Sequence, residues 1–452
     1  MRGWHEEREA GRLIGSWMCG LLILPAIFSL LFVSPGGAQE LGRFVLDNGL
    51  VVIVESSAES KTEAFELFIR VGVADEPPEA NGITNLVQHV LLKSTETRDA
   101  TAIANAIEDV GGVLDAEAET DVARVSCLVT ADVYQIGLEI LADVVARPTF
   151  PEEEIEKEKA AIVAEIGAQE DQSFSFAYHR LRRAMYGGHP YGRSPVGTVS
   201  CVSRLTREDV LDHYRRYYRA PNMVLSVAGG IPVAEMREAI EREFASLSGD
   251  EVERLPSSAV VWPERGGERT YDREILQSYI LIGYPGARIT SEDYVPLKVL
   301  DAVLSGGMSS RLFVNVRDRK GLAYDVGSFI PTRRDPAPFV IYLGTNPATA
   351  RQAVAALEHE TERVREEPVP DEEVERSKRY LSGRWRAEHQ RSSDRAYYRG
   401  WFEVLGIGYE FDNRYPLLIE TVTWEDLAEA AQTYLKNPTL VMLKPIGMET
   451  DW

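Results

Sequence analysis

The segment PEEEIEKEK, residues 151–159, recurs late in the chain as PDEEVERSK, residues 370–378. A second pair of segments matches in the same order, LTREDVLDHYRRYYRAPNMVLSV (205–227) and VTWEDLAEAAQTYLKNPTLVMLK (422–444). The two offsets are 219 and 217 residues, so the two alignments agree. A near-constant spacing between similar segments indicates an internal duplication. Because 452 residues are too many for one hydrophobic core, we expect two homologous domains.

Local patterns predict an α+β fold for each domain. The stretch FVLDNGLVVIVES (44–56) reads as a hairpin around Asn48-Gly49, and residues 113–130 read as a pair of strands. Helical patterns then follow as a block, so strands and helices are partly segregated along the chain. We therefore expect two duplicated domains, each a mostly antiparallel sheet with helices on one face.

The predicted domain boundaries follow from composition. The polar stretch around residues 247–269 contains Pro and Gly and is typical of an interdomain linker. It separates a first domain, residues 41–246, from a second, residues 270–448.

The N-terminal segment is typical of an export signal. Residues 13–33 carry no charge, and the small residues Gly36 and Ala38 suit cleavage before Gln39. We predict a signal peptide over residues 1–38 and an exported, periplasmic protein. The alternative is an uncleaved membrane anchor, since an apolar run of this length is just able to span a bilayer, which takes about 20 residues.

Charge and cysteine content exclude some classes of protein. The net charge is -22, which argues against nucleic acid as a partner because both would be anionic. Only Cys127 and Cys201 follow the predicted signal, and two cysteines do not make a disulfide framework. Cys127 lies in a predicted strand, where we expect it to be a small buried apolar residue.

The stretch NGITNLVQHVLLKST, residues 81–95, predicts an amphipathic helix that carries one histidine, His89. Asn85 lies one turn earlier, on the same face, where a second histidine would complete a metal-binding pair. An Asn amide oxygen is a weak zinc ligand, and the neighbouring Gln88 cannot act as a general base because it does not titrate. On chemistry alone, His89 fits a hydrogen-bonded core histidine better than a metal ligand.

Glu165 is the candidate third ligand. It is the only charged residue in AAIVAEIGA, where a carboxylate among apolar neighbours is uncommon unless it is paired or functional. The alternative is a glutamate at a partly exposed helix edge. The Glu-rich runs at 151–158 and 365–375 are predicted to be solvated faces near helix N-termini.

The second half contains SGGMSSRLFVNVRDRKGLAYDVGSF, residues 305–329. Its glycines lack the spacing of a phosphate-binding loop, so nucleotide binding is not expected. Taken alone, Arg317 and Tyr324 read as a helix-surface arginine and a packed tyrosine.

Several of these segments, together with HPYGRSPVGT (189–198) and HYRRYYRAPNMVLSVAG (213–229), resemble the pitrilysin/insulinase family of zinc peptidases. The resemblance covers nearly all of residues 41–447 and is closest to the shorter branch that includes the mitochondrial processing peptidase. The family's helix carries H-x-x-E-H. The resemblance places its first zinc histidine at Asn85, its catalytic glutamate at Gln88, its second histidine at His89 and its glutamate ligand at Glu165.

The same resemblance implies a clamshell-type peptidase fold in which two chains pair. It assigns Arg317 and Tyr324 to a pair that reaches the substrate across the chamber. With Asn85 and Gln88 in place of two active-site residues, the chain is expected to be a non-catalytic, substrate-gripping subunit. It would bind no metal itself, would act on unfolded peptides, and would pair with a homologous partner that carries H-x-x-E-H and zinc.

Two alternatives stay open. The first is a protease-derived scaffold or binding protein with no peptidase role. The second is an enzyme that binds metal through His89, Glu165 and a further donor.

Overall fold

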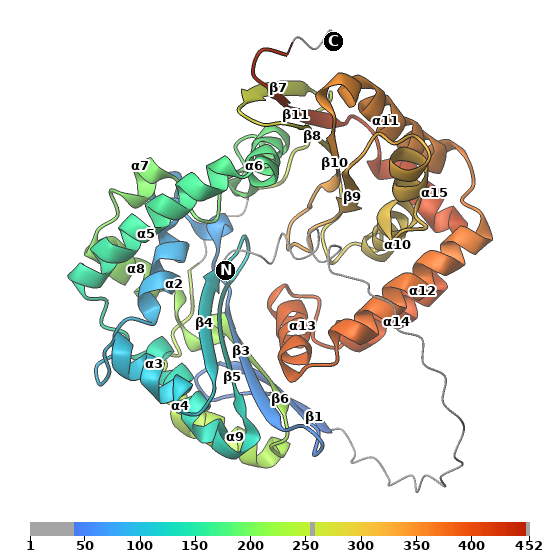
Figure 1. Ribbon diagram of the computed structural model, residues 1–452. Coiled ribbons are helices and arrows are strands. Elements are labelled where there is room, and N and C mark those ends of the chain that lie inside the picture. The colour runs from blue at the N-terminus through green and yellow to red at the C-terminus, as the bar shows by residue number, and fades with distance from the viewer. Residues whose placement is uncertain (1–39, 254–257, 449–452) are drawn as a thin grey trace, which may run out of the picture.

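The computed structural model describes residues 40–253 and 258–448 (Figure 1). The predicted signal segment, residues 1–38, lies outside this part of the chain. In the described ranges, no helix is both long and apolar enough to cross a membrane. Two sheets organise the described residues, one in each half of the chain.

The first half forms a six-stranded sheet in the order β1-β2-β6-β3-β5-β4. Its strands are β1 (Glu40–Val45), β2 (Val51–Ser56), β3 (Thr62–Ile69), β4 (Val113–Ala118), β5 (Ala123–Thr130) and β6 (Met223–Gly229). The predicted hairpin is β1 and β2, and the predicted strand pair over 113–130 is β4 and β5.

The second half forms a five-stranded sheet in the order β7-β11-β8-β10-β9. Its strands are β7 (Glu268–Arg273), β8 (Ser278–Tyr284), β9 (Asp325–Phe329), β10 (Phe339–Thr345) and β11 (Thr439–Pro445). Strand β7 takes up the last two residues of the predicted linker, because Glu268 already pairs in register with Leu440 of β11.

The two sheets repeat one topology. In the first, β2 runs parallel to β6, and β3, β5 and β4 follow in antiparallel order. In the second, β7 runs parallel to β11, and β8, β10 and β9 follow in the same way. The fold is therefore the predicted α+β architecture of two duplicated domains, and β1 is an addition to the first.

Apart from α6 and α13, the helices of each half lie on the outer side of its own sheet (Figure 1). The helices of the first half are α2 (Ile83–Leu91), α3 (Ala100–Glu108), α4 (Tyr134–Ala146), α5 (Glu152–Asp171), α6 (Ser173–Tyr186), α7 (Val199–Val202), α8 (Arg207–Tyr217) and α9 (Val233–Glu243). Those of the second are α10 (Tyr294–Ser305), α11 (Ala350–Glu366), α12 (Asp371–Glu388), α13 (Ser392–Val404), α14 (Phe411–Thr421) and α15 (Trp424–Tyr434).

Two of these helices cross over and pack on the sheet of the other half. Helix α6 packs on β8 and β11, while α13 packs on β3 and β6. Each of these helices lies so close to the sheet it packs on that a glycine stands at the contact. A Cβ on Gly283 of β8 would lie 2.3 Å from Met185 Sδ, and a Cβ on Gly400 of α13 would lie 2.4 Å from Phe68 Cε2. The inner faces of the sheets are therefore covered by exchanged helices, which the pattern of helices on one face did not predict.

Ion pairs fix α13 on the first sheet. The buried carboxylate of Glu55 contacts Arg395 Nε at 2.6 Å and Arg399 Nη2 at 2.6 Å. Arg43 Nη2 contacts Glu403 Oε1 at 2.8 Å. Because a buried ion left without its partner is costly, these pairs hold the two halves in one arrangement.

Candidate functional site

Helix α2 carries the candidate metal-binding positions, and a buried carboxylate caps its start. Glu76 accepts hydrogen bonds from the backbone N–H groups of Gly82 and Thr84 at 2.8 and 3.0 Å. Gly82 has a φ of 97°, a left-handed conformation that glycine adopts without strain. Burial raises the pKa of Glu76, and these hydrogen bonds oppose that rise. The helix thus begins at a fixed place in the first domain.

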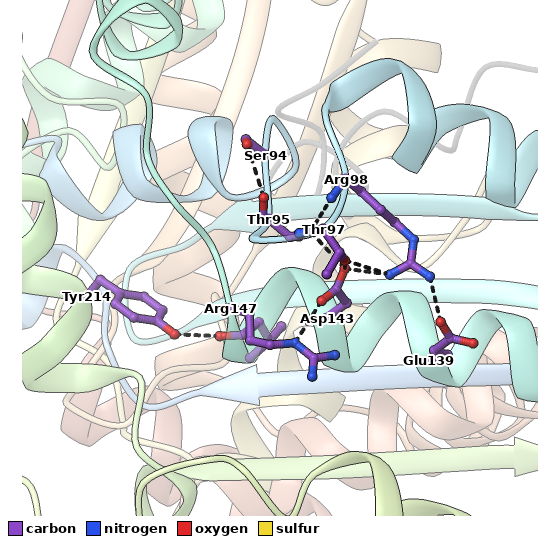
Figure 2. Close-up of polar contacts among 9 residues, drawn as sticks. Ser94, Thr95, Thr97, Arg98, Glu139, Asp143, Arg147 and Tyr214 are labelled. Atoms are coloured by element: carbon purple, nitrogen blue, oxygen red, sulfur yellow. Dashed lines mark hydrogen bonds and ion pairs between the residues drawn. The ribbon is translucent and has the colours of Figure 1, made fainter.

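A second buried carboxylate anchors the loop that follows α2. Asp143 of α4 accepts hydrogen bonds from Thr95 Oγ1 at 2.8 Å, Arg98 Nη1 at 2.7 Å and Arg147 Nε at 2.9 Å (Figure 2). Burial works to raise the pKa of Asp143, but the hydrogen bonds from Thr95, Arg98 and Arg147 outweigh it and lower the pKa. Both ends of α2 are therefore tied to the domain by carboxylates.

His89 lies between two glutamates of α5. Its Nδ1 donates to Glu158 Oε2 at 2.9 Å, and its Nε2 lies 4.0 Å from Glu165 Oε2. Glu158 also contacts Lys93 Nζ at 2.7 Å. The hydrogen bond from His89 and the charge of Lys93 lower the pKa of Glu158 to about 2. Since Glu158 fixes the hydrogen on Nδ1, the other ring nitrogen is oriented toward Glu165.

Asn85 and Gln88 are buried beside this histidine. The Asn85 Nδ2 has no hydrogen-bond partner among the described residues. Gln88 donates through Nε2 to Tyr218 Oη at 2.9 Å, while its Oε1 likewise lacks a partner in the described residues. Burial raises the pKa of Tyr218 far above its ordinary value, so its hydroxyl stays protonated. Neither amide side chain can supply the imidazole or the general base that a zinc peptidase needs here.

The residues present do not fit a catalytic zinc ion. Two zinc-type donors, His89 Nε2 and Glu165 Oε2, approach one another, whereas a catalytic zinc takes three protein ligands. Within the described ranges, no group of three His, Cys, Asp or Glu side chains is placed to hold a metal ion. No step of chemistry through a metal therefore follows from this site.

Sequence reasoning overlooked Glu158. The run 151–158 was predicted to be a solvated helix face, and that prediction is wrong for its last residue, whose side chain is 14% exposed and bound to His89 and Lys93. One signal was available in the sequence. Glu158 precedes Glu165 by seven residues, two helical turns, so both carboxylates share one face of α5.

Arg317 and Tyr324 lie in the second half of the chain. Arg317 lies near the end of a widened π-helical turn, η6 (Leu312–Asp318), and its guanidinium lies 4.9 Å from the centre of the Phe313 ring. Tyr324 directly precedes β9, and its side chain is 63% exposed rather than packed. Both side chains are exposed on the surface of this chain, so each is available to another molecule.

In the part of the chain that the structure describes, β4 is an edge strand of the first sheet. It contacts α2, and Val113 at its start is 60% exposed. An extended peptide can add to the edge of a sheet as a further strand. The strand pair predicted over 113–130 therefore ends in an edge strand that lies beside the helix carrying His89.

The fold and this incomplete site describe a two-domain, peptidase-like protein. Residues 51–199 match the family described as insulinase, peptidase family M16, and residues 204–381 match the peptidase M16 inactive domain. An uncharacterized zinc protease of Rickettsia felis is 31% identical over 338 residues, which cover 74% of this chain and 81% of that protein. The chain belongs to the insulinase family, peptidase family M16.

Other proteins show the same likeness. An uncharacterized zinc protease of Streptomyces coelicolor is 29% identical over 360 residues, which cover 77% of each chain. The crystal structure of a protease from Helicobacter pylori superimposes with a TM-score of 0.84 at 22% identity, covering 90% of this chain and 100% of that one. A peptidase M16 inactive domain from Pseudomonas fluorescens also gives 0.84 at 20% identity, covering 91% of this chain and 99% of the other.

Proposed function

We propose that this chain is the non-catalytic, substrate-gripping subunit of an exported, two-chain zinc metallopeptidase. A homologous partner carries the intact H-x-x-E-H motif and the zinc ion, and this chain carries no cofactor. The observation that supports the proposal most directly is the combination around His89. Its supporting glutamates, Glu158 and Glu165, are in place, whereas the positions of the other histidine and the base hold Asn85 and Gln88.

In this proposal Arg317 and Tyr324 act on a substrate bound at the partner's zinc. A fixed guanidinium and a phenol hydroxyl can both donate to a peptide carbonyl and stabilise the oxyanion that develops on it. Their exposure leaves them free to do so. Substrates are unfolded peptides, because a closed chamber excludes folded proteins and because an extended strand can pair with a sheet edge such as β4.

Export of the chain is part of the proposal. It rests on the uncharged run over residues 13–33 and the small residues before Gln39, and it places the pair of subunits in the periplasm. If the segment is retained, the same subunit is anchored in the membrane.

The test is purification of the tagged chain from its own cells at low salt. We expect a homologous H-x-x-E-H chain to co-purify one to one, with one zinc per pair and activity on an unstructured peptide. Arg317→Ala or Tyr324→Phe in this subunit should lower kcat/KM by about 10²–10³-fold, the range found when one oxyanion donor is removed. Pair assembly and zinc content should not change.

Arg319→Ala is the matched control. Arg319 is exposed, lies two residues beyond Arg317 and donates to Asn315 of its own segment at 3.1 Å. Arg319→Ala should leave kcat/KM within about twofold of the wild-type value, since surface substitutions away from a site have small effects. A chain that purifies alone, without metal or activity, would refute the two-chain peptidase and favour the scaffold or binding protein.

A further inference from the structure

His389 lies at the corner where α12, α13 and α14 meet. It directly follows the last residue of α12, and its side chain is 8% exposed. Its ring is stacked between two aromatic rings, whose centres lie 4.1 Å away for Trp385 and 4.8 Å away for Tyr398. Both aromatic residues also line a cavity of about 610 Å³ between the two halves of the chain. The corner therefore borders the contact between the halves.

Both ring nitrogens of His389 face hydrogen-bond acceptors. Its Nδ1 lies 2.7 Å from the backbone oxygen of Trp385, and its Nε2 lies 2.7 Å from Oδ1 of Asp412. A carbonyl oxygen and an ionised carboxylate accept hydrogen bonds but do not donate them. A neutral imidazole carries one N–H and can make one of these two bonds, whereas the imidazolium ion makes both. The pattern of acceptors therefore selects the doubly protonated ring when Asp412 is ionised.

The ends of two helices favour charge on both partners. Asp412 is fully buried in the first turn of α14, where the helix dipole stabilises an anion, and its Oδ2 lies 3.7 Å from Arg399 Nε. His389 caps the C-terminal end of α12, where the dipole stabilises a cation. The ring faces of Trp385 and Tyr398 attract a cation as well. The contact between His389 and Asp412 is therefore an ion pair rather than a neutral hydrogen bond.

The charged side chains in contact with this corner come from each element packed there: Arg384 and Glu388 of α12, Arg395 and Arg399 of α13, Asp412 of α14 and Glu55 of β2. Arg384 contacts Glu388 at 2.8 Å, and Arg395 Nη1 donates to the backbone oxygen of His389 at 3.3 Å. Polar contacts thus run from the ring through Asp412 and Arg399 to Glu55. Since Glu55 fixes α13 on the first sheet, the charge on His389 acts on the joint between the halves.

We propose that protonation of His389 locks the corner of α12, α13 and α14, and with it the packing of α13 on the first sheet. Loss of the second ring proton then loosens this joint. Histidine is the side chain whose ordinary titration falls between about pH 5 and 8, so such a device operates near neutral pH. The inference goes beyond the proposed function, because it needs neither zinc nor a partner chain.

The direction of the pH effect follows from the two hydrogen bonds. The folded state holds the second proton through bonds to Trp385 and Asp412 that the unfolded chain lacks. The stabilisation is therefore complete at acid pH, and it is lost as the pH rises beyond the range in which an unfolded histidine titrates.

Nuclear magnetic resonance of the purified chain with ¹⁵N-labelled histidine tests the protonation directly. Contacts of the ring protons with Trp385 and Tyr398 identify the His389 signal, so this measurement needs no variant. We expect both ring nitrogens to carry a proton at about pH 7.5, where an ordinary histidine is mostly neutral. A ring with one unprotonated nitrogen at this pH would overturn the proposal, including the case in which the proton lies on Asp412.

Hydrogen exchange of residues 392–404 tests the link to α13. Wild type and His389→Gln are compared at the same pH, so the intrinsic exchange rates cancel. At about pH 6 we expect α13 to exchange at least about tenfold faster in the variant, because Asp412 loses its buried cationic partner. At about pH 9.5, where the wild-type ring is also neutral, the two rates should agree within about twofold.

His359→Gln is the matched control, since His359 is exposed on α11, and it should behave as the wild type at both pH values. An equal excess of exchange in His389→Gln at both pH values would show that the ring acts by its shape alone. No excess at about pH 6 would show that the corner does not hold α13. Either result would overturn the proposal.

Discussion

His89 is held as a metal-ligating histidine is held, although Asn85 stands where a second histidine would be needed. A carboxylate that accepts from the second ring nitrogen is the usual outer support of such a histidine, and Glu158 supplies it at 2.9 Å. The Nε2 of His89 and Oε2 of Glu165 are 4.0 Å apart, and zinc bonds to N and O are about 2.0–2.2 Å long. Both atoms can therefore reach one ion after a small rotation, and the identity of residue 85 decides whether a third ligand joins them.

Asn85→His should restore zinc binding. It adds the third protein ligand one helical turn before His89, so we expect one zinc per chain and an affinity at least about a hundredfold above the wild type. The measurement is zinc content after equilibrium dialysis against micromolar zinc.

Asn85→His combined with Glu165→Gln is the control, and it should return to the zinc content of the wild type. If Asn85→His alone stays free of zinc, then His89 and Glu165 are not positioned to share an ion.

Titration of the single side chain of Glu63 makes the free energy of unfolding depend on pH. Its side chain is fully buried, its Oε2 accepts from the N–H groups of Gly230 and Ile231, and burial raises its pKa to about 7, although those two hydrogen bonds oppose the rise. Because the folded state then holds a proton that the unfolded state has lost, the free energy of unfolding should fall as pH rises from about 4.5 to about 7.

Glu63→Gln keeps an oxygen for the two backbone donors and removes this titration. We expect a gain of up to about 3 kcal/mol in unfolding free energy at pH 8 and no gain at pH 4. Urea titrations at both pH values measure it, with Glu59→Gln at an exposed position as the control. If Glu63→Gln changed the unfolding free energy equally at pH 4 and pH 8, the raised pKa of Glu63 would be contradicted.

At the scale of elements, the exchange of α6 and α13 depends on close packing. Helix α13 lies over β3 and β6 because Gly400 lets the helix backbone approach Phe68 and Ser226. Glycine in the interior of a helix costs about 1 kcal/mol relative to alanine. Packing against the sheet therefore outweighs helix propensity at this position.

Gly400→Ala should destabilise the protein by about 1–3 kcal/mol, because the added Cβ would overlap Phe68 at 2.4 Å and approach Ser226 Cβ at 2.9 Å. Gly383→Ala in α12 is the matched control. Nothing lies within 4 Å of its Cβ position, so the same substitution should stabilise the protein by up to about 1 kcal/mol. Denaturant unfolding measures both. If Gly400→Ala raised the unfolding free energy, α13 would not be packed closely on the first sheet.

At the scale of the whole molecule, the exchanged helices join the two halves. Hydrophobic residues of both halves share one core, in which Phe68 and Val224 pack with Trp401 and Phe402. The ion pairs of Glu55 with Arg395 and Arg399 cross the same boundary. The cavity between the two halves exists only because this arrangement holds the two sheets across from one another.

The two halves should therefore unfold as one unit. We expect a single transition in calorimetry, with a calorimetric enthalpy equal to the van't Hoff enthalpy, although the chain has two domains. Residues 40–246 produced alone should fail to give a cooperative transition, because the inner face of their sheet loses α13. Two separate transitions in the intact chain would contradict this coupling.

Much of the fold follows from local sequence patterns. The repeat of PEEEIEKEK as PDEEVERSK predicted the duplication, and the strand pair predicted over 113–130 is β4 and β5. Cys127 is 2% exposed, as its apolar strand indicated. Asn85 and Gln88 could be read directly as lacking the chemistry of a ligand and a base, because that depends only on residue type.

The tertiary structure decided the contacts between distant parts of the chain. Glu158 lies 69 residues from His89 in sequence, and only the packing of α2 on α5 brings the two together. The exchange of α6 and α13 and the cavity between the halves also join residues far apart in the chain. Periodicity reports which face of an element is buried, but the partner that buries it is chosen by long-range packing, so the sequence alone determined the elements and their duplication while the tertiary structure decided what each element faces.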